Sequence, residues 1–588
     1  MEKNNFYRTM LKTLLLVSLF CFLPLSAFAQ AWTTTGTVID ESGEPIIGAT
    51  VMEQGTTNGV QTDFDGKYSI KVKPNAKLMF SYVGCVTKTL DALNGKLDVT
   101  LTTDAKILDD VVVIGYGTVK KQDATGSVVA IKPDEFNKGN RVTAQDALVG
   151  QMPGVNVVPG SGAPGSGATI RIRSGASLSA SNDPLIVIDG VPVDNSEING
   201  SSNIISTLNP DDIETFTVLK DASATAIYGS RGAYGVVIIT TKKGEKERGN
   251  IALKASFGFD QIQRTLPLLK AYQFASLHNE MMAGAGQPQN LAFTDPTQLG
   301  EGTDWTSELY QFAPTQNYAL SYSGGTKKSN FYVSGAYFNQ KGIVKTTSYE
   351  RITLQFNHDT ELLDWLRFGH KLSLNHDVKQ SGDYNILNTM IALPTQAIKN
   401  EDGTWAGPVG LAMYVGDVAN PIGKMMENRS KTSGYNLLGN IYAEIKPLDC
   451  LTFKSTFGMQ VMYWDTNKWT PKYDWAPIAQ PESEAFRSFD KSVTWLWDNT
   501  LTYMETFKEK HSLTAMIGES MQANTYEYMS GSIQGFISDS AQQLSNGTLD
   551  PVLAGNKSDW SLLSFMARVS YGYDNRYLIT ATCRADGS

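Results

Sequence analysis

The 588-residue chain has few cysteines, few histidines and no excess of positive charge. Its four cysteines lie too far apart for a disulfide framework or for a zinc site built from closely spaced ligands. Acidic residues outnumber Lys and Arg by 59 to 50, which gives a formal net charge of −9 and argues against nucleic acid as a partner. These absences exclude a disulfide scaffold and a basic nucleic-acid-binding protein.

Residues with catalytic or metal-binding chemistry do not cluster. His370 and His376, six residues apart in a predicted strand, would lie about 20 Å from each other, too far for one metal ion. Residues 160–165, GSGAPG, match the G-x-G-x-x-G pattern, but a strand pattern follows where a dinucleotide site needs a helix. We therefore expect neither an enzyme nor a bound metal or cofactor.

Long apolar runs are also rare, and the main one lies at the N-terminus. Lys3, Arg8 and Lys12 precede the apolar residues 14–25, and an Ala-Phe-Ala cleavage pattern ends at residue 29. This order predicts a secretory signal peptide over residues 1–29. The rival interpretation, a membrane anchor, needs roughly 20 apolar residues, and this run is shorter and contains a proline.

Glycine and aromatic residues are abundant, with 52 Gly, 25 Tyr, 24 Phe and 10 Trp, which indicates a mainly β protein with many turns. Residues 33–103 contain short strand patterns separated by turn sequences such as ESGEP and KPNA. This spacing predicts an N-terminal β-sandwich. Residues 125–244 mix strand patterns with short helical ones and predict an α+β domain.

From residue 250 onward, apolar and polar residues alternate over long segments. In residues 451–464, Phe453, Phe457 and Val461 share one face, whereas Lys454 and Gln460 lie on the other. A soluble sandwich alternates in the same way. Short turns, however, are interleaved with long loops predicted at 261–314, 378–432 and 465–490, and that pattern is typical of an outer-membrane β-barrel.

The number of predicted strands indicates how much of a barrel residues 250–588 would form. Residues 250–588 supply about eleven strand patterns, an odd number that cannot close a bacterial antiparallel barrel. We therefore expect the first part of a plugged barrel of the 22-stranded kind, and hence an N-terminal fragment.

Three passages carry a family resemblance: DVVVIGYGTVKK (110–121), PLIVIDGVPVDN (184–195) and LNPDDIETFTVLKDASATAIYGSRGAYGVVIITTKKG (208–244). They resemble the SusC/RagA family of TonB-dependent outer-membrane transporters. The resemblance implies a carboxypeptidase-regulatory-like domain over 33–103, a plug domain over 119–244, and the first half of a transmembrane β-barrel over 250–588.

The resemblance also implies a TonB box over residues 109–118. Its TonB-binding residues would be Val111, Val112, Val113, Ile114, Gly115, Tyr116 and Gly117. We expect this β-branched run to be exposed and to join the sheet edge of TonB, with its glycines acting as a pivot.

Further residues have implied roles in the plug. Arg171, Arg173 and Arg231 would hold the plug in the barrel through ion pairs, although they also fit ordinary surface arginines. Structural roles, such as turns and a helix N-cap, are expected for Asp189, Gly190, Asp221, Tyr228 and Gly229.

Aromatic residues in the predicted long loops are possible stacking platforms for a sugar ligand. They are Trp305, Trp405, Trp469, Tyr473 and Trp475. The rival interpretation is loop packing or an interfacial aromatic belt.

The resemblance implies import of a nutrient too large for porins, an oligosaccharide or a peptide. The implied partners are the TonB-ExbB-ExbD complex, a SusD-like surface lipoprotein and outer-membrane lipid, with the N-terminal domains in the periplasm and lumen. A competing hypothesis is a surface receptor or adhesin without active transport. The two hypotheses differ over residues 110–117, because an adhesin has no use for a coupling strand.

Overall fold

The computed structural model divides into two compact units, residues 1–110 and residues 111–588. The described residues are 32–40, 44–46, 48–56, 58–82, 85, 87–102, 111–120, 126–133, 136, 143–172, 182–193, 204–247, 249–407, 419–475, 479–574 and 576–588. The predicted signal peptide and Arg173 lie outside the described residues.

The first unit is a β-sandwich. One sheet has the order β4-β1-β7 with β8 also paired to β1, and the other has the order β3-β2-β5-β6. The strands are β1 (Trp32–Ile39), β2 (Thr50–Glu53), β3 (Gly59–Gln61), β4 (Lys67–Val72), β5 (Lys77–Ser81), β6 (Lys88–Asp91), β7 (Gly95–Lys96) and β8 (Val99–Thr100). Alternate residues of β4 are buried, and they join Val38, Leu78 and Phe80 in one core. The predicted N-terminal sandwich is confirmed.

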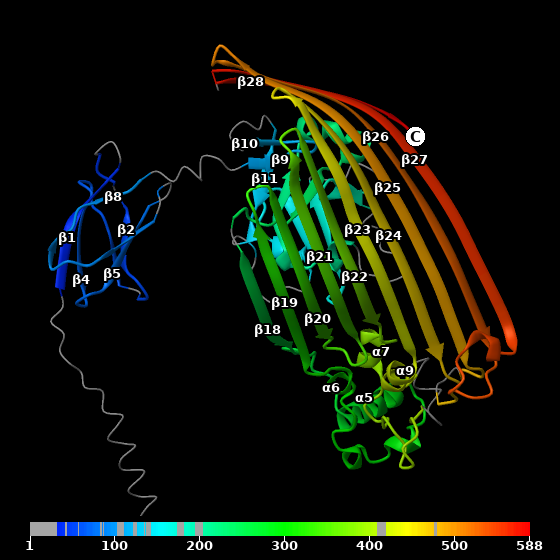
Figure 1. Cartoon of the computed structure of the whole chain (residues 1–588). Coiled ribbons are helices and arrows are strands. Elements are labelled where there is room, and N and C mark those ends of the chain that lie inside the picture. The colour runs from blue at the N-terminus through cyan, green and yellow to red at the C-terminus, as the bar shows by residue number, and fades with distance from the viewer. Residues whose placement is uncertain are drawn as a thin grey trace, which may run out of the picture. The chain divides into compact units, whose positions relative to one another are not determined.

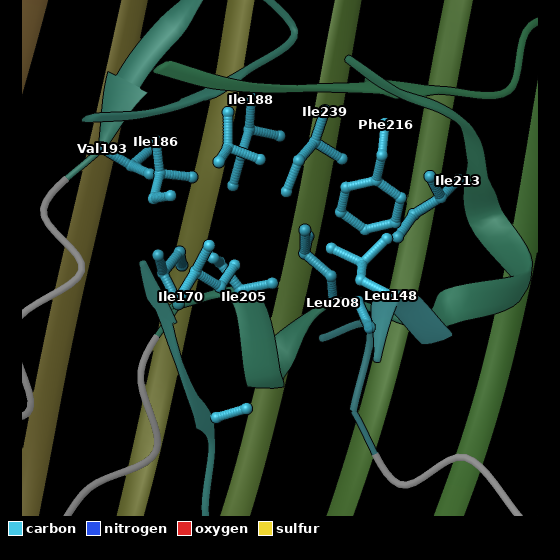
Figure 2. Close-up of a cluster of buried hydrophobic side chains, with 14 of the residues drawn as sticks. Leu148, Ile170, Ile186, Ile188, Val193, Ile205, Leu208, Ile213, Phe216 and Ile239 are labelled. Carbon is cyan, nitrogen blue, oxygen red and sulfur yellow. The ribbon is translucent and has the colours of Figure 1, made fainter. Parts of the chain in front are cut away.

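The second unit begins with an α+β domain built on a five-stranded sheet of order β11-β16-β17-β14-β15. Its strands are β11 (Val128–Ile131), β14 (Leu185–Ile188), β15 (Val191–Val193), β16 (Ile213–Leu219) and β17 (Val236–Thr241), and a separate pair is formed by β12 (Val155–Pro159) and β13 (Ala168–Ile172). Figure 2 shows the core under this sheet, where Ile188, Ile239 and Phe216 lie opposite Ile205 and Leu148. This core fixes the sheet on which the site is built.

The rest of the second unit is one antiparallel sheet of eleven consecutive strands, the number expected from the alternation. The strands are β18 (Asn250–Asp260), β19 (Ala313–Gly325), β20 (Ser329–Lys341), β21 (Ser348–Leu363), β22 (Leu366–Gln380), β23 (Arg429–Leu448), β24 (Leu451–Thr470), β25 (Glu484–Phe507), β26 (His511–Gln534), β27 (Leu549–Tyr573) and β28 (Tyr577–Gly587). The sheet curves past the α+β domain, which lies on its concave side (Figure 1).

The two faces of this sheet differ in polarity as predicted. Phe457, Trp497 and Phe565 point away from the α+β domain and are 42%, 45% and 57% exposed. Gln460 and Ser564, on the opposite face, are fully buried. The outer face is thus apolar and the inner face polar, as in a barrel that turns its apolar residues toward lipid.

Several strands are longer than the ten or so residues expected of a membrane strand. Strands β23 to β27 contain 20 to 25 residues each. The bounds predicted for the loop over 465–490 are therefore wrong, because the loop spans only residues 471–483. The ladder between β24 and β25 continues to the pair Thr470 and Glu484, where backbone hydrogen bonds hold a polar sequence in strands.

Short turns and longer connections alternate along the sheet. The short turns are 326–328, 364–365, 449–450, 508–510 and 574–576, and the longer connections are 261–312, 342–347, 381–428, 471–483 and 535–548. The longer loops carry α5 (Ala271–Gly284), α6 (Trp305–Leu309), α7 (Ile386–Ile391) and α9 (Pro421–Glu427). Within the described ranges, no helix has the length and hydropathy needed to cross a bilayer.

The core assigned to the N-terminal sandwich can be tested with a buried and an exposed phenylalanine. We expect Phe80→Ala to lower the free energy of unfolding of the isolated sandwich by about 3–5 kcal/mol, because Phe80 is fully buried and its loss leaves a cavity. Phe64→Ala is the control, since Phe64 is 85% exposed, and it should change that free energy by less than about 0.5 kcal/mol. Urea unfolding followed by circular dichroism measures both. Equal losses would contradict the assigned core.

Candidate functional site

The α+β domain contacts the inner face of the sheet through polar side chains, and Asp212 is a buried example. It ends η4 (Pro210–Asp212) and accepts hydrogen bonds from Tyr332 and Ser334 of β20 at 2.8 and 2.6 Å. Burial raises the pKa of Asp212, against the opposing effect of its hydrogen bonds from Ser334, Tyr332 and Asn209. Asp212 therefore anchors η4 to the sheet.

Side chains on the next three strands bind backbone carbonyls of the α+β domain. The donor–acceptor pairs are Arg351–Ser206 at 2.6 Å, Asn357–Lys242 at 2.6 Å, Asn375–Thr207 at 2.9 Å and Asn440–Asp189 at 2.8 Å. A buried carbonyl without a partner is costly, so these donors fix where the α+β domain lies along the sheet.

Asp189 and Gly190 form the two-residue turn between β14 and β15. Their φ values are 52° and 90°, as in the type I′ hairpin turns for which Asp-Gly is preferred. The Asp189 carboxylate also forms an ion pair with Lys371 of β22 and accepts hydrogen bonds from the backbone nitrogen and Oγ1 of Thr241 at 3.0 and 2.7 Å. The turn is therefore also a bridge to the sheet.

The segment interpreted as a TonB box forms a hairpin. Strand β9 (Val111–Val113) pairs antiparallel with β10 (Thr118–Lys120), and the backbone nitrogen of Ile114 donates to the carbonyl of Gly117 at 3.1 Å. Gly115 and Tyr116 have φ values of 69° and 36°, again as in a type I′ turn. A positive φ is unusual for an aromatic residue, so the backbone at Tyr116 is strained. We call residues 114–117 the coupling turn.

The coupling turn packs against the α+β domain and the sheet. The ring of Tyr116 lies 6.2 Å from the ring of Tyr228, and a Cβ on Gly115 would approach Tyr228 to 2.8 Å. Arg568 of β27 donates to the carbonyls of Ile114 and Gly115 at 3.4 and 3.5 Å. The expectation of an exposed, unpaired segment is therefore wrong for these residues, because the turn has partners that its local sequence does not reveal.

Residues of three strands surround the Tyr116 side chain: Asp498 of β25, Ser520 of β26 and Arg584 of β28. Burial raises the pKa of Tyr116, and the Asp498 carboxylate raises it further, whereas Arg584 lowers it. The phenol therefore stays neutral at physiological pH and interacts with the sheet as a polar group.

The segment η5 (Ala226–Gly232) lies against β28. Tyr228 is 5% exposed, and Gly229 has a φ of 64°. A Cβ on Gly229 would lie 2.0 Å from the carboxylate of Asp586. Arg584, which pairs with Asp586 at 2.7 Å, donates to the carbonyl of Ile227 at 2.7 Å. Only glycine fits so close an approach at this φ.

Two of the three arginines proposed as plug–barrel contacts lie in the described residues. Arg231 donates a hydrogen bond to Gln522 of β26 and thus bridges to the sheet. The ion pair of Arg171 is instead with Asp183, within the α+β domain. Arg173 lies outside the described residues, so its role stays a prediction.

Asp221 is the N-cap of α4 (Ala222–Thr225). Its carboxylate accepts a hydrogen bond from the backbone nitrogen of Ala224 at 2.8 Å and another from that of Ser127, just before β11. One side chain thereby fixes both the start of a helix and the entry to a strand.

The loop aromatics divide into two groups. Trp305, in α6, and Trp469, in β24, are 2% and 5% exposed, so stacking on a ligand is the wrong interpretation for them: both side chains are buried. Trp405, Tyr473 and Trp475 are half-buried and contact one another, with Tyr473 stacked on Trp475 at 4.5 Å and Trp405 at 6.5 Å from Trp475. For these three rings, ligand stacking stays a prediction.

A cavity of about 740 Å³ lies among the coupling turn, the Asp189–Gly190 turn and strands β21 to β27. Its lining is rich in hydroxyl and charged side chains. Within the described ranges, no group of three or more His, Cys, Asp or Glu residues is placed to hold a metal ion. The chemistry available in the cavity is hydrogen bonding and ion pairing.

Sequence reasoning did not single out the residues of the sheet that hold this site. Lys371, Asp498, Arg568 and Arg584 all lie on the inner face of their strands. In the sequence, each of these residues is recognisable as a charged residue at a polar position of an alternating strand. That pattern identifies the face, but not the partner that each charge meets.

Two protein families match the chain. The TonB-dependent Receptor Plug Domain matches residues 120–236, and the CarboxypepD_reg-like domain matches residues 34–113. The first match covers the α+β domain up to the start of β17, and the second covers the sandwich.

Curated relatives and solved structures agree with these families. TonB-dependent receptor SusC of Bacteroides thetaiotaomicron is 35% identical over 100% of this chain and 59% of its own length, and TonB-dependent receptor P26 of Formosa agariphila is 34% identical over 97% and 57%. The RagAB peptide importer in its closed-closed state matches 79% of this chain and 55% of its own with a TM-score of 0.68 and 27% identity. The chain thus spans little more than half the length of these relatives.

Two glycines allow a test of the contact between η5 and β28. Gly229→Ala should destabilise the full-length protein by about 1–3 kcal/mol more than Gly150→Ala, because the new methyl group collides with Asp586. Gly150 also has a positive φ, of 71°, but a Cβ there would have no atom within 4 Å. Differential scanning calorimetry of the two variants gives the comparison. Equal destabilisation would rule out the close approach.

Proposed function

Since the chain belongs to the SusC/RagA family of TonB-dependent receptors, we propose that it provides the plug and the coupling segment of an energy-driven importer in the outer membrane. The α+β domain is the plug, the curved sheet is the barrel wall against which it rests, and residues 111–117 are the TonB-binding residues of a TonB box over 109–118. The importer takes up a nutrient too large for porins.

The β9–β10 hairpin is the observation that carries this proposal. In the described part of the chain, β9 pairs only with β10, so the second edge of β9 is available for a strand of TonB. The hydrogen bonds from Arg568 to the coupling turn are long, at 3.4 and 3.5 Å, and therefore weak. A pull on the chain before residue 111 would detach this hairpin before it disturbed the short hydrogen bonds around Asp212.

The cargo and further partners follow from family membership. One solved relative is described as a peptide importer, and the rings of Trp405, Tyr473 and Trp475 suit stacking on a sugar. We infer a peptide or oligosaccharide cargo, a SusD-like lipoprotein at the cell surface, and TonB-ExbB-ExbD as the energy source. The sandwich and β9 would then lie in the periplasm.

Deletion of residues 111–117 from the full-length protein should abolish uptake while surface ligand binding persists, because the plug core and the long loops stay intact. Uptake and binding of labelled cargo by whole cells measure the two quantities separately. Unchanged uptake by the deletion mutant would favour a surface receptor or adhesin.

A pair of point variants separates main-chain pairing from side-chain effects. Val113 and Thr118 form a non-hydrogen-bonded pair of the hairpin, so the backbone N–H of Val113 faces the free edge of β9. Val113→Pro removes this donor and should reduce uptake at least tenfold, whereas Val113→Ala keeps it and should retain most uptake. Equal uptake by the two variants would contradict pairing of β9 with a TonB strand.

A further inference from the structure

The cavity beside the coupling turn has an excess of positive charge, although the chain as a whole is acidic. Its cationic lining residues are Lys243, Arg367, Lys371, Lys446, Lys454 and Arg568. Its acidic lining residues are Asp189, Asp359, Glu444 and Asp498. Six cations against four carboxylates leave a net charge of +2.

Three of the four carboxylates are paired with cations of the same lining. Lys371 pairs with Asp189, Arg367 with Asp359 at 3.5 Å, and Lys446 with Glu444 at 3.3 Å. The fourth carboxylate, Asp498, interacts with Ser520 and Arg584 of the sheet and with Tyr116 and Arg231 of the plug side. The acidic groups are therefore largely committed to partners.

Two of the remaining cations, Lys454 and Arg568, come from strands of the sheet. Among the described residues, neither has a carboxylate oxygen within 4.0 Å. The ammonium group of Lys454 lies 4.5 Å from the centre of the Tyr442 ring. Arg568 donates two long hydrogen bonds to the coupling turn and interacts with the Tyr228 side chain. A guanidinium group has five N–H donors, so Arg568 retains donors for another acceptor.

Hydroxyl groups complete the polar lining around these cations. They belong to Thr452, Thr456, Thr500, Thr502, Thr514 and Ser570. Cations together with hydroxyl donors provide the hydrogen bonds that carboxylate and sulfate oxygens accept, and such charge-assisted bonds are stronger than those between neutral groups.

We propose that this cavity is an oxyanion site with two anchoring cations, Lys454 of β24 and Arg568 of β27, each of which binds a carboxylate or sulfate group of the cargo as it passes between plug and barrel wall. The inference rests on the proposed import function for its biological role, and it narrows the cargo to molecules that carry such a group. The site itself depends only on the residues of the cavity.

The test uses crystals of the full-length protein soaked with two anions that scatter anomalously. Selenate represents a sulfate group, and 4-bromobenzoate represents a carboxylate. We expect an anomalous peak for at least one probe within hydrogen-bond distance of Lys454 or Arg568, and the probe that binds identifies the preferred group. No peak in the cavity with either probe would overturn the proposal.

Variants of Lys454 and Arg568 show whether these two cations bind the probe. The double variant K454Q/R568Q should lower probe occupancy at least about tenfold, since hydrogen bonds to charged groups are lost. K468Q is the matched control: Lys468 is on the same strand and face, and also lies over an aromatic ring, 5.2 Å from the centre of Phe486. Full occupancy in the double variant, with its fold visible in the same map, would refute the assignment. Because the readout needs no transport, failure here is distinct from failure of the import proposal.

Discussion

The alternation of side chains across the eleven-stranded sheet constrains the rest of this structure. An outer face that meets lipid leaves a polar inner face, so the plug must be held by hydrogen bonds and ion pairs as well as by apolar packing. Gln460 and Ser564 illustrate that face, and Asp212 illustrates the matching polarity on the plug. Each contact of this kind contributes about 1 kcal/mol net, but leaving one of its groups buried and unpaired costs more. Such an interface is specific, and in the proposed import function it would exchange its partners for water as the plug moves.

The contacts are unevenly distributed along the plug. Short hydrogen bonds of 2.6 to 2.9 Å join it to β20 through β23, whereas the coupling turn is held on β27 by contacts of 3.4 and 3.5 Å. The strained backbone of Tyr116 lies in this turn. On the far side of the turn, Arg584 of β28 donates to the carbonyl of Ile227 at 2.7 Å, so the long contacts are those between the coupling turn and β27. The cavity lies beside that turn.

Much of the architecture followed from local patterns. Period-two alternation identified the strands, their number and the face that each one exposes, and Asp-Gly identified the turn at Asp189. The strand lengths could not be predicted from these patterns, because the ladder between β24 and β25 continues through polar residues in which apolar and polar side chains do not alternate. The docking of the coupling turn could not be predicted either, since Arg568 and Asp498 lie hundreds of residues away from Tyr116 in the chain. Local sequence therefore predicted a free strand, whereas the segment forms a hairpin whose turn is held by tertiary contacts.

The central claim is that residues 111–120 belong to the folded interface between the α+β domain and the sheet in the protein alone. Hydrogen exchange of the full-length protein in the absence of TonB measures this most directly, at the amides of residues 111–120. The structure predicts protection at Ile114, whose amide donates to Gly117, and at the paired amides of the β9–β10 hairpin. Exchange of these amides at the rate of an unfolded peptide, while β16 and β17 stay protected, would contradict it.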